Sequence, residues 1–299
     1  MKYTALADAD CAIAQALGVV GDWWSLLVIR EVAGGLHRFD GLQRELGVSR
    51  KVLAERLAKL VDAGVLEKRA YSQRPPRFEY HLTDRGHGLL PVLIALQDWG
   101  TRHLQSDGSL TGTSTPGSAE SRRVAGLIGQ RLPVDRMAGH DGARHDPVGD
   151  SPWTVLYCFP GAAPPGERFY PPGWGDIPGA AGCTLESITY RERHAELLAA
   201  GVTVRGASTQ RPDQLAAFAE HAGLPFVLLS DADLALGGAL RLPTFRAGGV
   251  DRLKRLTLVL DAGRTIRHVQ FPITDPAGSV DEALTLVQGG VDGRQKPAR

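Results

Sequence analysis

The sequence of 299 residues has no apolar run close to the roughly 20 residues that a membrane-crossing helix needs. Asp8 and Asp10 stand where a secretion signal would have its apolar core. The three cysteines, Cys11, Cys158 and Cys183, include no CxxC pair. These absences argue against a membrane protein, an exported protein, a disulfide scaffold and a zinc site. They predict a chain of the reducing cytoplasm that has no membrane partner.

Histidines also lack the spacing of a metal site. His140 and His145 lie in a stretch rich in Gly and Asp, with no third ligand at a regular interval. A metal site is one interpretation, but a simple loop is favoured. We therefore expect no metal and no cofactor.

The length favours two domains over one. Residues 106–123 read SDGSLTGTSTPGSAESRR, a composition typical of a flexible linker. The sequence therefore predicts four segments. They are a first domain at 1–105, a Ser/Gly-rich linker at 106–131, a second domain at 132–290 and a disordered tail at 291–299. VAGLIGQRL at 124–132 is a candidate short helix that docks on one of the domains.

The first domain has the pattern of helices interrupted by one hairpin. Helices are predicted over 11–17, 24–32 and 39–46, and a fourth starts after Ser49, a good N-cap residue. The fourth helix places an apolar stripe on one face, formed by Val52, Leu53, Leu57, Leu60 and Val61. Helix, glycine-containing turn and helix in this order indicate a helix-turn-helix, whose second helix enters the major groove of DNA.

Positive charge gathers in this part of the chain, although the net charge is only +1. Predicted strands at 66–71 and 78–82 enclose a tip that holds two arginines and two prolines, as in a wing that contacts DNA. The candidate DNA contacts are Ser49, Arg50, Lys51 and Arg56 on the fourth helix, with Arg74 and Arg77 at the hairpin tip. A following helix carries Leu89, Leu93, Leu96 and Trp99, which predict a dimer interface.

Residues 8–105 resemble the HxlR-type winged-helix regulators, relatives of the MarR group. The resemblance rests on Cys11 and on the segments GDWWSLLVIREV, RFDGLQREL, VSRKVLAERLAKLVDAGVLEKR, PPRFEYHLT and ALQDW. It implies a homodimer on a pseudo-palindromic double-stranded DNA operator. Several such regulators sense oxidants through an N-terminal cysteine, and Cys11 occupies that place. The alternative for Cys11 is a small buried residue.

The second domain is organised around IPGAAGCTLESITYR, which places Cys183 between a Pro/Gly/Ala loop and a predicted helix. Unpaired N–H groups and the positive end of the helix dipole favour an anion there. We expect a thiolate with a pKa lowered from about 8.5 towards about 6. The alternative is a small apolar residue packed under the helix end. Strands predicted at 153–159 and 202–208 on either side of this helix form a βαβ unit.

GCTLESITYR and AELLAAGVTVRGAST, with the later PFVLLSDAD and LKRLTLVLD, resemble the peroxiredoxins, most closely their Q-type branch. The resemblance implies an α/β thioredoxin-like fold. It also implies that Cys183 attacks hydrogen peroxide or an organic hydroperoxide and becomes a sulfenic acid. Arg255 would hold the thiolate and polarise the leaving oxygen, and Thr184 and Glu186 match the motif around the cysteine. A thioredoxin-like protein or a low-molecular-weight thiol would be the reductant.

Two positions depart from the peroxiredoxin pattern. Ala180 stands where the family usually has a Thr or Ser whose hydroxyl binds the peroxide, and Ile188 stands where many members keep a resolving cysteine. The local disulfide of those members cannot form here. Cys11 and Cys158 are the other candidate redox partners. For Cys158, within a predicted strand, a buried structural cysteine is favoured.

Together these patterns predict a multidomain chain, with a mainly-α winged helix-turn-helix followed by an α/β thioredoxin-like domain. The leading hypothesis is a peroxide-responsive regulator, in which oxidation of Cys183 changes operator binding through linker tension, domain docking or a Cys11–Cys183 disulfide. One alternative is a thiol peroxidase that carries a DNA-binding domain. Another is a regulator whose redoxin domain has lost its chemistry and binds a ligand or partner.

Overall fold

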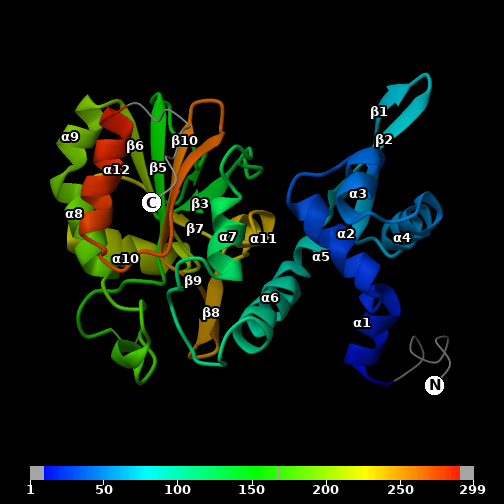
Figure 1. Cartoon of the computed structure of the whole chain (residues 1–299), viewed down its shortest axis with the longest axis horizontal. Helices are drawn as coiled ribbons and strands as arrows, with labels where there is room; N and C mark the ends of the chain where they lie inside the picture. Colours follow the sequence, from blue (N-terminus) through cyan, green and yellow to red (C-terminus); the bar gives the residue numbers. More distant parts are fainter. Residues whose placement is uncertain (1–9, 168, 290–299) are drawn as a thin grey trace. The chain divides into compact units, whose positions relative to one another are not determined.

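The computed structural model of the chain describes residues 10–167 and 169–289. The chain divides after Leu93 into two compact units, and each is described here by itself (Figure 1). The first unit is mainly helical and the second has a mixed sheet covered by helices. The predicted fold class is confirmed for both.

The first unit consists of short helices and one hairpin. Its elements are α1 (Ala12–Val20), α2 (Trp23–Ala33), α3 (Phe39–Leu46), α4 (Arg50–Asp62), β1 (Leu66–Gln73), β2 (Pro76–Leu82) and α5 (Asp84–His87), followed by α6 (Leu90–Leu104). The Ser49 hydroxyl accepts the Val52 N–H at 3.3 Å, which confirms the predicted N-cap of α4. Leu53, Leu57 and Leu60 are buried in one core with α2 and α3. The apolar stripe therefore does fix how α4 packs.

The hairpin is longer than the sequence predicts. β1 and β2 pair in antiparallel fashion from Leu66↔Leu82 to Gln73↔Pro76. Pairing therefore extends beyond the alternating residues, and Arg74 lies in the connection between the strands while Arg77 lies at the start of β2.

The second unit is built on a seven-stranded mixed sheet with the order β11-β10-β5-β6-β7-β3-β4. Its strands are β3 (Met137–Gly139), β4 (Arg144–His145), β5 (Trp153–Cys158), β6 (Val202–Ser208), β7 (Leu228–Ser230), β10 (Leu256–Asp261) and β11 (Ile266–Gln270). β5, β6 and β7 run parallel, which confirms the predicted βαβ unit. A separate hairpin pairs β8 (Thr244–Ala247) with β9 (Val250–Leu253).

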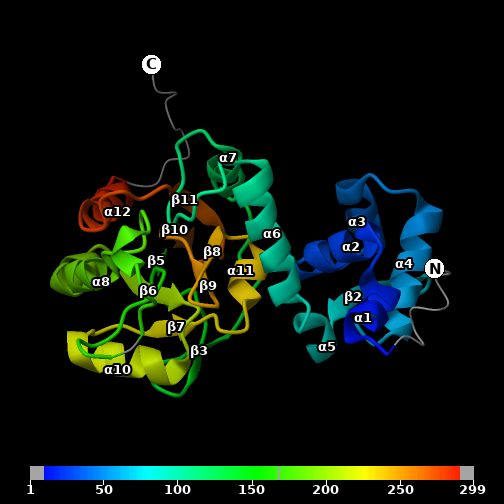
Figure 2. The same cartoon turned by 90° about the horizontal axis from the view of Figure 1, so that it is seen from below.

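Helices cover both faces of this sheet (Figure 2). α8 (Cys183–Glu192), α9 (His194–Ala199), α10 (Pro212–Ala222) and α12 (Gly278–Gln288) pack on one face, and α7 (Ala119–Ala125) and α11 (Ala235–Ala239) pack on the other. Strand side chains alternate between the faces, so Tyr157 enters the first core and Cys158 the second. Cys183 belongs to the first core. The two cysteines therefore lie in cores on opposite sides of the sheet.

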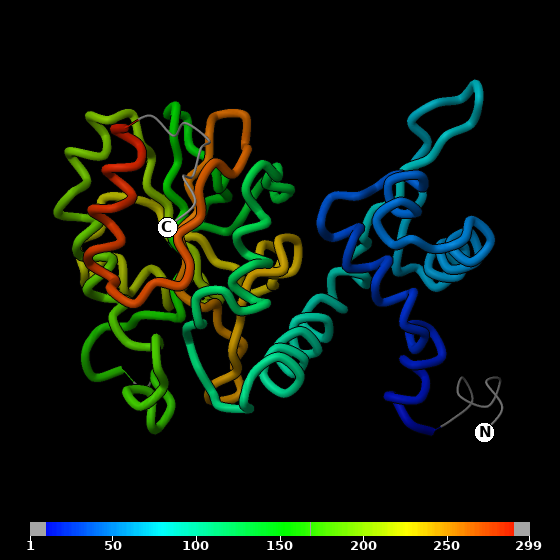
Figure 3. Tube along the Cα trace, viewed as in Figure 1, coloured from blue at the N-terminus to red at the C-terminus, as the bar shows by residue number. Residues whose placement is uncertain are grey.

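Residues 106–131, for which the sequence predicts a flexible linker, pack against the second unit. They contain α7, and Val124 and Leu127 are buried in the same core as Leu236 and Leu258. Figure 3 follows this stretch of chain from α6 into α7. A few apolar residues within a Ser/Gly-rich composition are enough to dock it. The division after Leu93 also lies earlier than the boundary predicted at residue 105. The tail predicted for 291–299 lies outside the described residues.

Within the described residues, no single helix is long and apolar enough to cross a membrane. α1 and α2 reach that length and composition only as a pair, with a bend of 73° between them.

Two adjacent residues after α7 test whether this segment is packed or free. Leu127 is 4% exposed and Ile128 is 40% exposed. We expect Leu127→Ala to lower the free energy of unfolding by about 2–5 kcal/mol, because it empties a buried site. Ile128→Ala, the matched control, should change it by about 0.5 kcal/mol or less. Urea denaturation followed by circular dichroism measures both, and equal effects would mean that the segment does not pack.

Candidate functional site

Cys183 is the first residue of α8, as predicted, and follows a backbone turn that favours glycine. Gly182 has φ 101°, and a Cβ atom there would lie 2.8 Å from Cγ of Pro276. Cys183 is 3% exposed, and its thiol donates a hydrogen bond to the Ala180 carbonyl at 3.5 Å. The sulfur therefore lies in a closed site at a helix start.

Arg255 brings a positive charge to this sulfur. It directly precedes β10, and Nη2 lies 3.4 Å from Sγ of Cys183 and 2.9 Å from the Ala181 carbonyl oxygen. Nη1 forms an ion pair with the Glu186 carboxylate one turn along α8. Arg255 is 1% exposed and Glu186 is fully buried. The structure thus brings together three residues that the sequence assigns to one site.

The electrostatics of the site differ from the prediction. Burial raises the pKa of the Cys183 thiol, and the Arg255 charge lowers it. The Glu186 carboxylate raises the pKa further, whereas a hydrogen bond from the Gly161 backbone N–H lowers it. The resulting pKa is raised, so the predicted lowering is wrong. The reason is that the thiol is desolvated while Arg255 shares its charge with Glu186. Burial also raises the pKa of Glu186 to about 7, against the pull of Arg255.

Tyr170 also belongs to the site, and the sequence analysis did not single it out. Its hydroxyl oxygen accepts the Ala163 N–H at 3.3 Å and hydrogen-bonds the half-buried Thr184 side chain. Burial raises the pKa of Tyr170, and the nearby Cys183 raises it further. The signal that could have found Tyr170 is the cluster of aromatic residues in the long loop before Cys183.

Arg252 is a second arginine near the sulfur. It is 3% exposed, lies on β9, and donates from Nη1 to the Pro160 carbonyl at 3.2 Å. Burial lowers the pKa of Arg252, whereas Cys183 and Tyr170 raise it. No sequence pattern distinguishes Arg252 from its neighbours, because its position depends on how the β8–β9 hairpin folds.

The other two cysteines have different surroundings. Cys158 is buried in the core on the opposite face of the sheet from Cys183, and burial raises its pKa well above the ordinary value. Cys11 is exposed and precedes α1, so the interpretation of it as a small buried residue is wrong. Within the second unit, therefore, no other cysteine among the described residues lies in the core of Cys183.

Two of the predicted DNA contacts are already paired within the first unit, since the exposed Arg50 forms an ion pair with Asp40 at 3.3 Å and Arg56 forms one with Asp22. Lys51, Arg74 and Arg77 are exposed, and the exposed Ser49 caps α4. Asp22, which lies 3.2 Å from Arg56, is the N-cap residue of α2. The helical pattern could not show this because Asp22 is distant in the sequence.

Neither candidate metal ligand is free. The His145 ring pairs with the Asp141 carboxylate at 2.8 Å, and Nδ1 of His140 accepts the Leu228 N–H at 3.0 Å. Across residues 10–167 and 169–289 there is no group of three His, Cys, Asp or Glu side chains placed to hold a metal. The two histidines thus help to hold the β3–β4 edge of the sheet.

The Cys183 sulfur and the Glu186 carboxylate compete for the positive charge of Arg255, and this competition predicts how the pH dependence of Cys183 should change. We expect Glu186→Gln to shift the pH midpoint of Cys183 alkylation by iodoacetamide about one unit lower, because the like charge is removed and Arg255 serves the thiolate alone. Glu192→Gln is the matched control, since Glu192 lies on the same helix with its side chain 65% exposed. Alkylation rates from pH 5 to 10, resolved by peptide mass, measure both. A midpoint that stays in place or rises in Glu186→Gln contradicts this account.

Two families of known proteins match separate parts of the chain. The HxlR-like helix-turn-helix family matches residues 19–108, and the AhpC/TSA family matches residues 177–269. An uncharacterised HTH-type transcriptional regulator from Mycobacterium tuberculosis is 40% identical over 93 residues, which are 31% of this chain and only 59% of that relative's length. The HTH-type regulator YtfH from Escherichia coli is 38% identical over 100 residues, which are 33% of this chain and 79% of YtfH.

The solved structure of peroxidoxin BcpB from Mycobacterium tuberculosis covers 55% of this chain and 97% of its own length, with 22% identity and a TM-score of 0.46. The family matches and the relatives, not this likeness, carry the assignment. The chain belongs to the HxlR-like helix-turn-helix family and carries, after its helix-turn-helix domain, a domain of the AhpC/TSA family with a thioredoxin-like fold.

Proposed function

We propose that the chain is a transcription regulator that responds to hydroperoxides, in which oxidation of Cys183 changes the affinity of the winged helix for its operator. One observation carries this proposal. The segment that leads out of α6, residues 110–113, is hydrogen-bonded to the loop that immediately precedes Cys183. The connection between the two family domains therefore touches the redox site.

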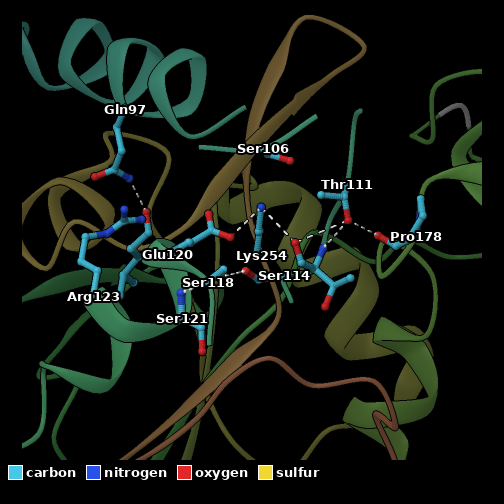
Figure 4. Close-up of polar contacts among 12 residues, drawn as sticks. Gln97, Ser106, Thr111, Ser114, Ser118, Glu120, Ser121, Arg123, Pro178 and Lys254 are labelled. Carbon is cyan, nitrogen blue, oxygen red and sulfur yellow. Dashed lines mark hydrogen bonds and ion pairs between the residues drawn. The ribbon is translucent and has the colours of Figure 1, made fainter. Parts of the chain in front are cut away.

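The contacts of the 110–113 segment are close (Figure 4). The Gly112 N–H donates to the Pro178 carbonyl at 2.7 Å, and the Thr111 hydroxyl donates to the same oxygen at 3.4 Å. A Cβ atom on Gly112 would lie 3.0 Å from the Ala180 nitrogen, and one on Gly179 would lie 2.6 Å from Cβ of Thr113. Two glycines thus allow the backbones to approach each other.

Lys254, the neighbour of Arg255, holds the segment from the other side. Its ammonium donates to the Thr113 carbonyl at 3.0 Å and pairs with Glu120 of α7 at 2.9 Å (Figure 4). Lys254 and Glu120 are both buried. Breaking such a pair is strongly destabilising, so the 110–120 stretch has a defined position relative to β10.

A change at the sulfur reaches this segment through only a few bonds. The Cys183 thiol donates to the Ala180 carbonyl, and Arg255 donates to the Ala181 carbonyl. Loss of the thiol proton removes the first of these bonds, and an added oxygen needs space in a closed site. Both changes act on the loop whose Pro178 holds Gly112.

The chemistry is a two-electron exchange. The Cys183 thiolate attacks one oxygen of a hydroperoxide, the O–O bond breaks, the sulfur becomes a sulfenic acid, and the other oxygen leaves and takes a proton to form an alcohol or water. A thiol reductant, thioredoxin-like or of low molecular weight, then forms a mixed disulfide and releases water. The proposal needs a compartment that holds both DNA and reducing thiols, such as the cytoplasm.

The first unit offers a surface suited to double-stranded DNA. A hollow of about 830 Å³ lies between α3 and the hairpin, and its lining includes Arg38, Arg44, Arg50 and Arg77.

Exposed apolar side chains support a homodimer, as operators with two half-sites require. They are Ile13 and Leu17 on α1, and Val92, Leu96 and Trp99 on α6.

Oxidant-dependent DNA binding tests the proposal. With a duplex selected from random sequence, we expect one equivalent of hydrogen peroxide to change the Kd by about fivefold or more, because coupling free energies between sites are commonly of that size. Cys183→Ser should show no change. Fluorescence anisotropy measures the Kd, and peptide mass reports the state of each cysteine.

Gly112→Ala tests whether the contact between the 110–113 segment and the Pro178 loop carries the response from Cys183. Gly100→Ala is its control, since a Cβ on Gly100 meets nothing within 4 Å. We expect Gly112→Ala to keep Cys183 oxidation but to weaken the response of the Kd. An equal Kd for reduced and oxidised wild type rejects the regulator. Peroxide turnover with a thiol reductant would then favour a thiol peroxidase with a tethered DNA-binding domain, and an inert Cys183 would favour a domain that only binds a ligand or partner.

A pair of charge variants on α4 tests the DNA surface. We expect Lys51→Gln to weaken binding to all duplexes and to reduce the slope of log K against log salt by about one, because it removes a phosphate contact. Arg56→Gln should leave the slope unchanged, since its guanidinium is paired with Asp22. Titrations at several salt concentrations measure the slopes, and a smaller slope in Arg56→Gln would restore Arg56 as a DNA contact.

A further inference from the structure

Arg252 is buried, and none of the carboxylates in the described part of the chain forms an ion pair with it. Its guanidinium lies over the rings of Phe169 and Trp174, at 4.7 and 4.8 Å from their centres. Among the described residues, its Nε is buried and has no hydrogen-bond acceptor. The ionisable groups that face it are Cys183 and Tyr170. Buried donors are nearly always paired, so this N–H indicates an acceptor that the chain itself does not provide.

Tyr170 has a hydrogen-bond donor directed to the same place. Its hydroxyl oxygen accepts the Ala163 N–H at 3.3 Å, and its hydrogen bond with the Thr184 side chain lowers the pKa of the phenol, as a bond donated by the threonine does. A phenol that accepts these bonds still has its own proton to donate. The neighbouring Gly161 N–H faces the Cys183 sulfur. Residues 161–163 therefore hold the thiol and the phenol side by side.

Gly161 also explains how Arg252 comes so close. It has φ 145°, and a Cβ atom there would lie 2.6 Å from the Phe169 ring and 3.0 Å from Nη1 of Arg252. Only glycine permits this backbone shape together with these two approaches. Ala180 accepts the Cys183 thiol with its carbonyl, has no side-chain hydroxyl, and packs with Phe245 and Trp174.

We propose that Tyr170 and Arg252 bind the hydroperoxide that Cys183 reduces. This rests on the oxidation of Cys183 in the proposed function and adds the residues that contact the substrate. Tyr170 donates its hydroxyl proton in a hydrogen bond to the oxygen that leaves, and Arg252 donates its Nε–H to the hydroperoxide. The thiolate attacks the other oxygen, the O–O bond breaks, and the leaving oxygen takes its proton from water. Both donors act on charge that develops as this bond breaks.

Tyr170→Phe separates this role from a structural one, because it keeps the ring and removes only the hydroxyl. We expect the second-order rate of Cys183 oxidation by hydrogen peroxide to fall about 100-fold. Alkylation of the same thiol by iodoacetamide, which needs no bound hydroperoxide, should keep its rate and its pH midpoint. Tyr71→Phe is the matched control, since Tyr71 is an exposed tyrosine of β1. Stopped mixing followed by intact mass measures all these rates.

Arg252→Lys keeps the charge and removes the Nε–H, so it should also slow oxidation more than alkylation. The double variant should lose less than the product of the two single effects, because both donors bind one ligand. The proposal is overturned if Tyr170→Phe is oxidised at the wild-type rate, or if its oxidation and alkylation rates fall equally.

The same samples distinguish this proposal from the regulatory one. Tyr170→Phe, once fully oxidised, should show the wild-type shift in operator Kd. Normal oxidation of wild type without any shift in Kd rejects regulation and leaves the roles of Tyr170 and Arg252 standing. A wild-type thiol that no hydroperoxide oxidises rejects both.

Discussion

A single guanidinium balances the charges around Cys183, because Arg255 faces both the Cys183 sulfur and the Glu186 carboxylate inside the protein core. All three groups are almost fully buried, so none of their charges is stabilised by water. The Cys183 sulfur and the Glu186 carboxylate therefore share the positive charge of Arg255. With a pKa of about 7, Glu186 exchanges its proton in the physiological range, and each protonation leaves Arg255 free to stabilise the thiolate. The reactivity of the sulfur is thus linked to a carboxyl group that takes no part in the chemistry.

Much of the fold could be predicted from local sequence signals. The strand predicted at 202–208 has the bounds of β6, and Ser49 marks the start of α4 because its side chain satisfies a free N–H. The βαβ unit around Cys183 follows from the order of its elements. Each of these features depends on residues that are close together in the chain.

The features that could not be predicted depend on residues far apart in the chain. The pKa of Cys183 depends on burial and on an ion pair between Glu186 and Arg255, and composition does not reveal either. Arg56 lies on the exposed-looking side of a helical pattern, but tertiary packing brings Asp22 to it. The apolar segment VAGLIGQRL does indicate docking within the linker composition, but it does not show that Val124 and Leu127 are buried in the core of the second unit. Residue composition and spacing do not determine which side chains tertiary packing brings into contact.

The sheet separates Cys158 from Cys183, so Cys158 cannot reduce an oxidised Cys183 by forming a disulfide with it. Neighbouring side chains of β5 point to opposite faces, so a disulfide between these cysteines would require the strand to turn over. Within its own unit, an oxidised Cys183 has no internal thiol to reset it. If Cys183 is oxidised as proposed, its reduction depends on a thiol from outside its own unit, either Cys11 or a small thiol or reductase, and the supply of that thiol would set the lifetime of the oxidised form.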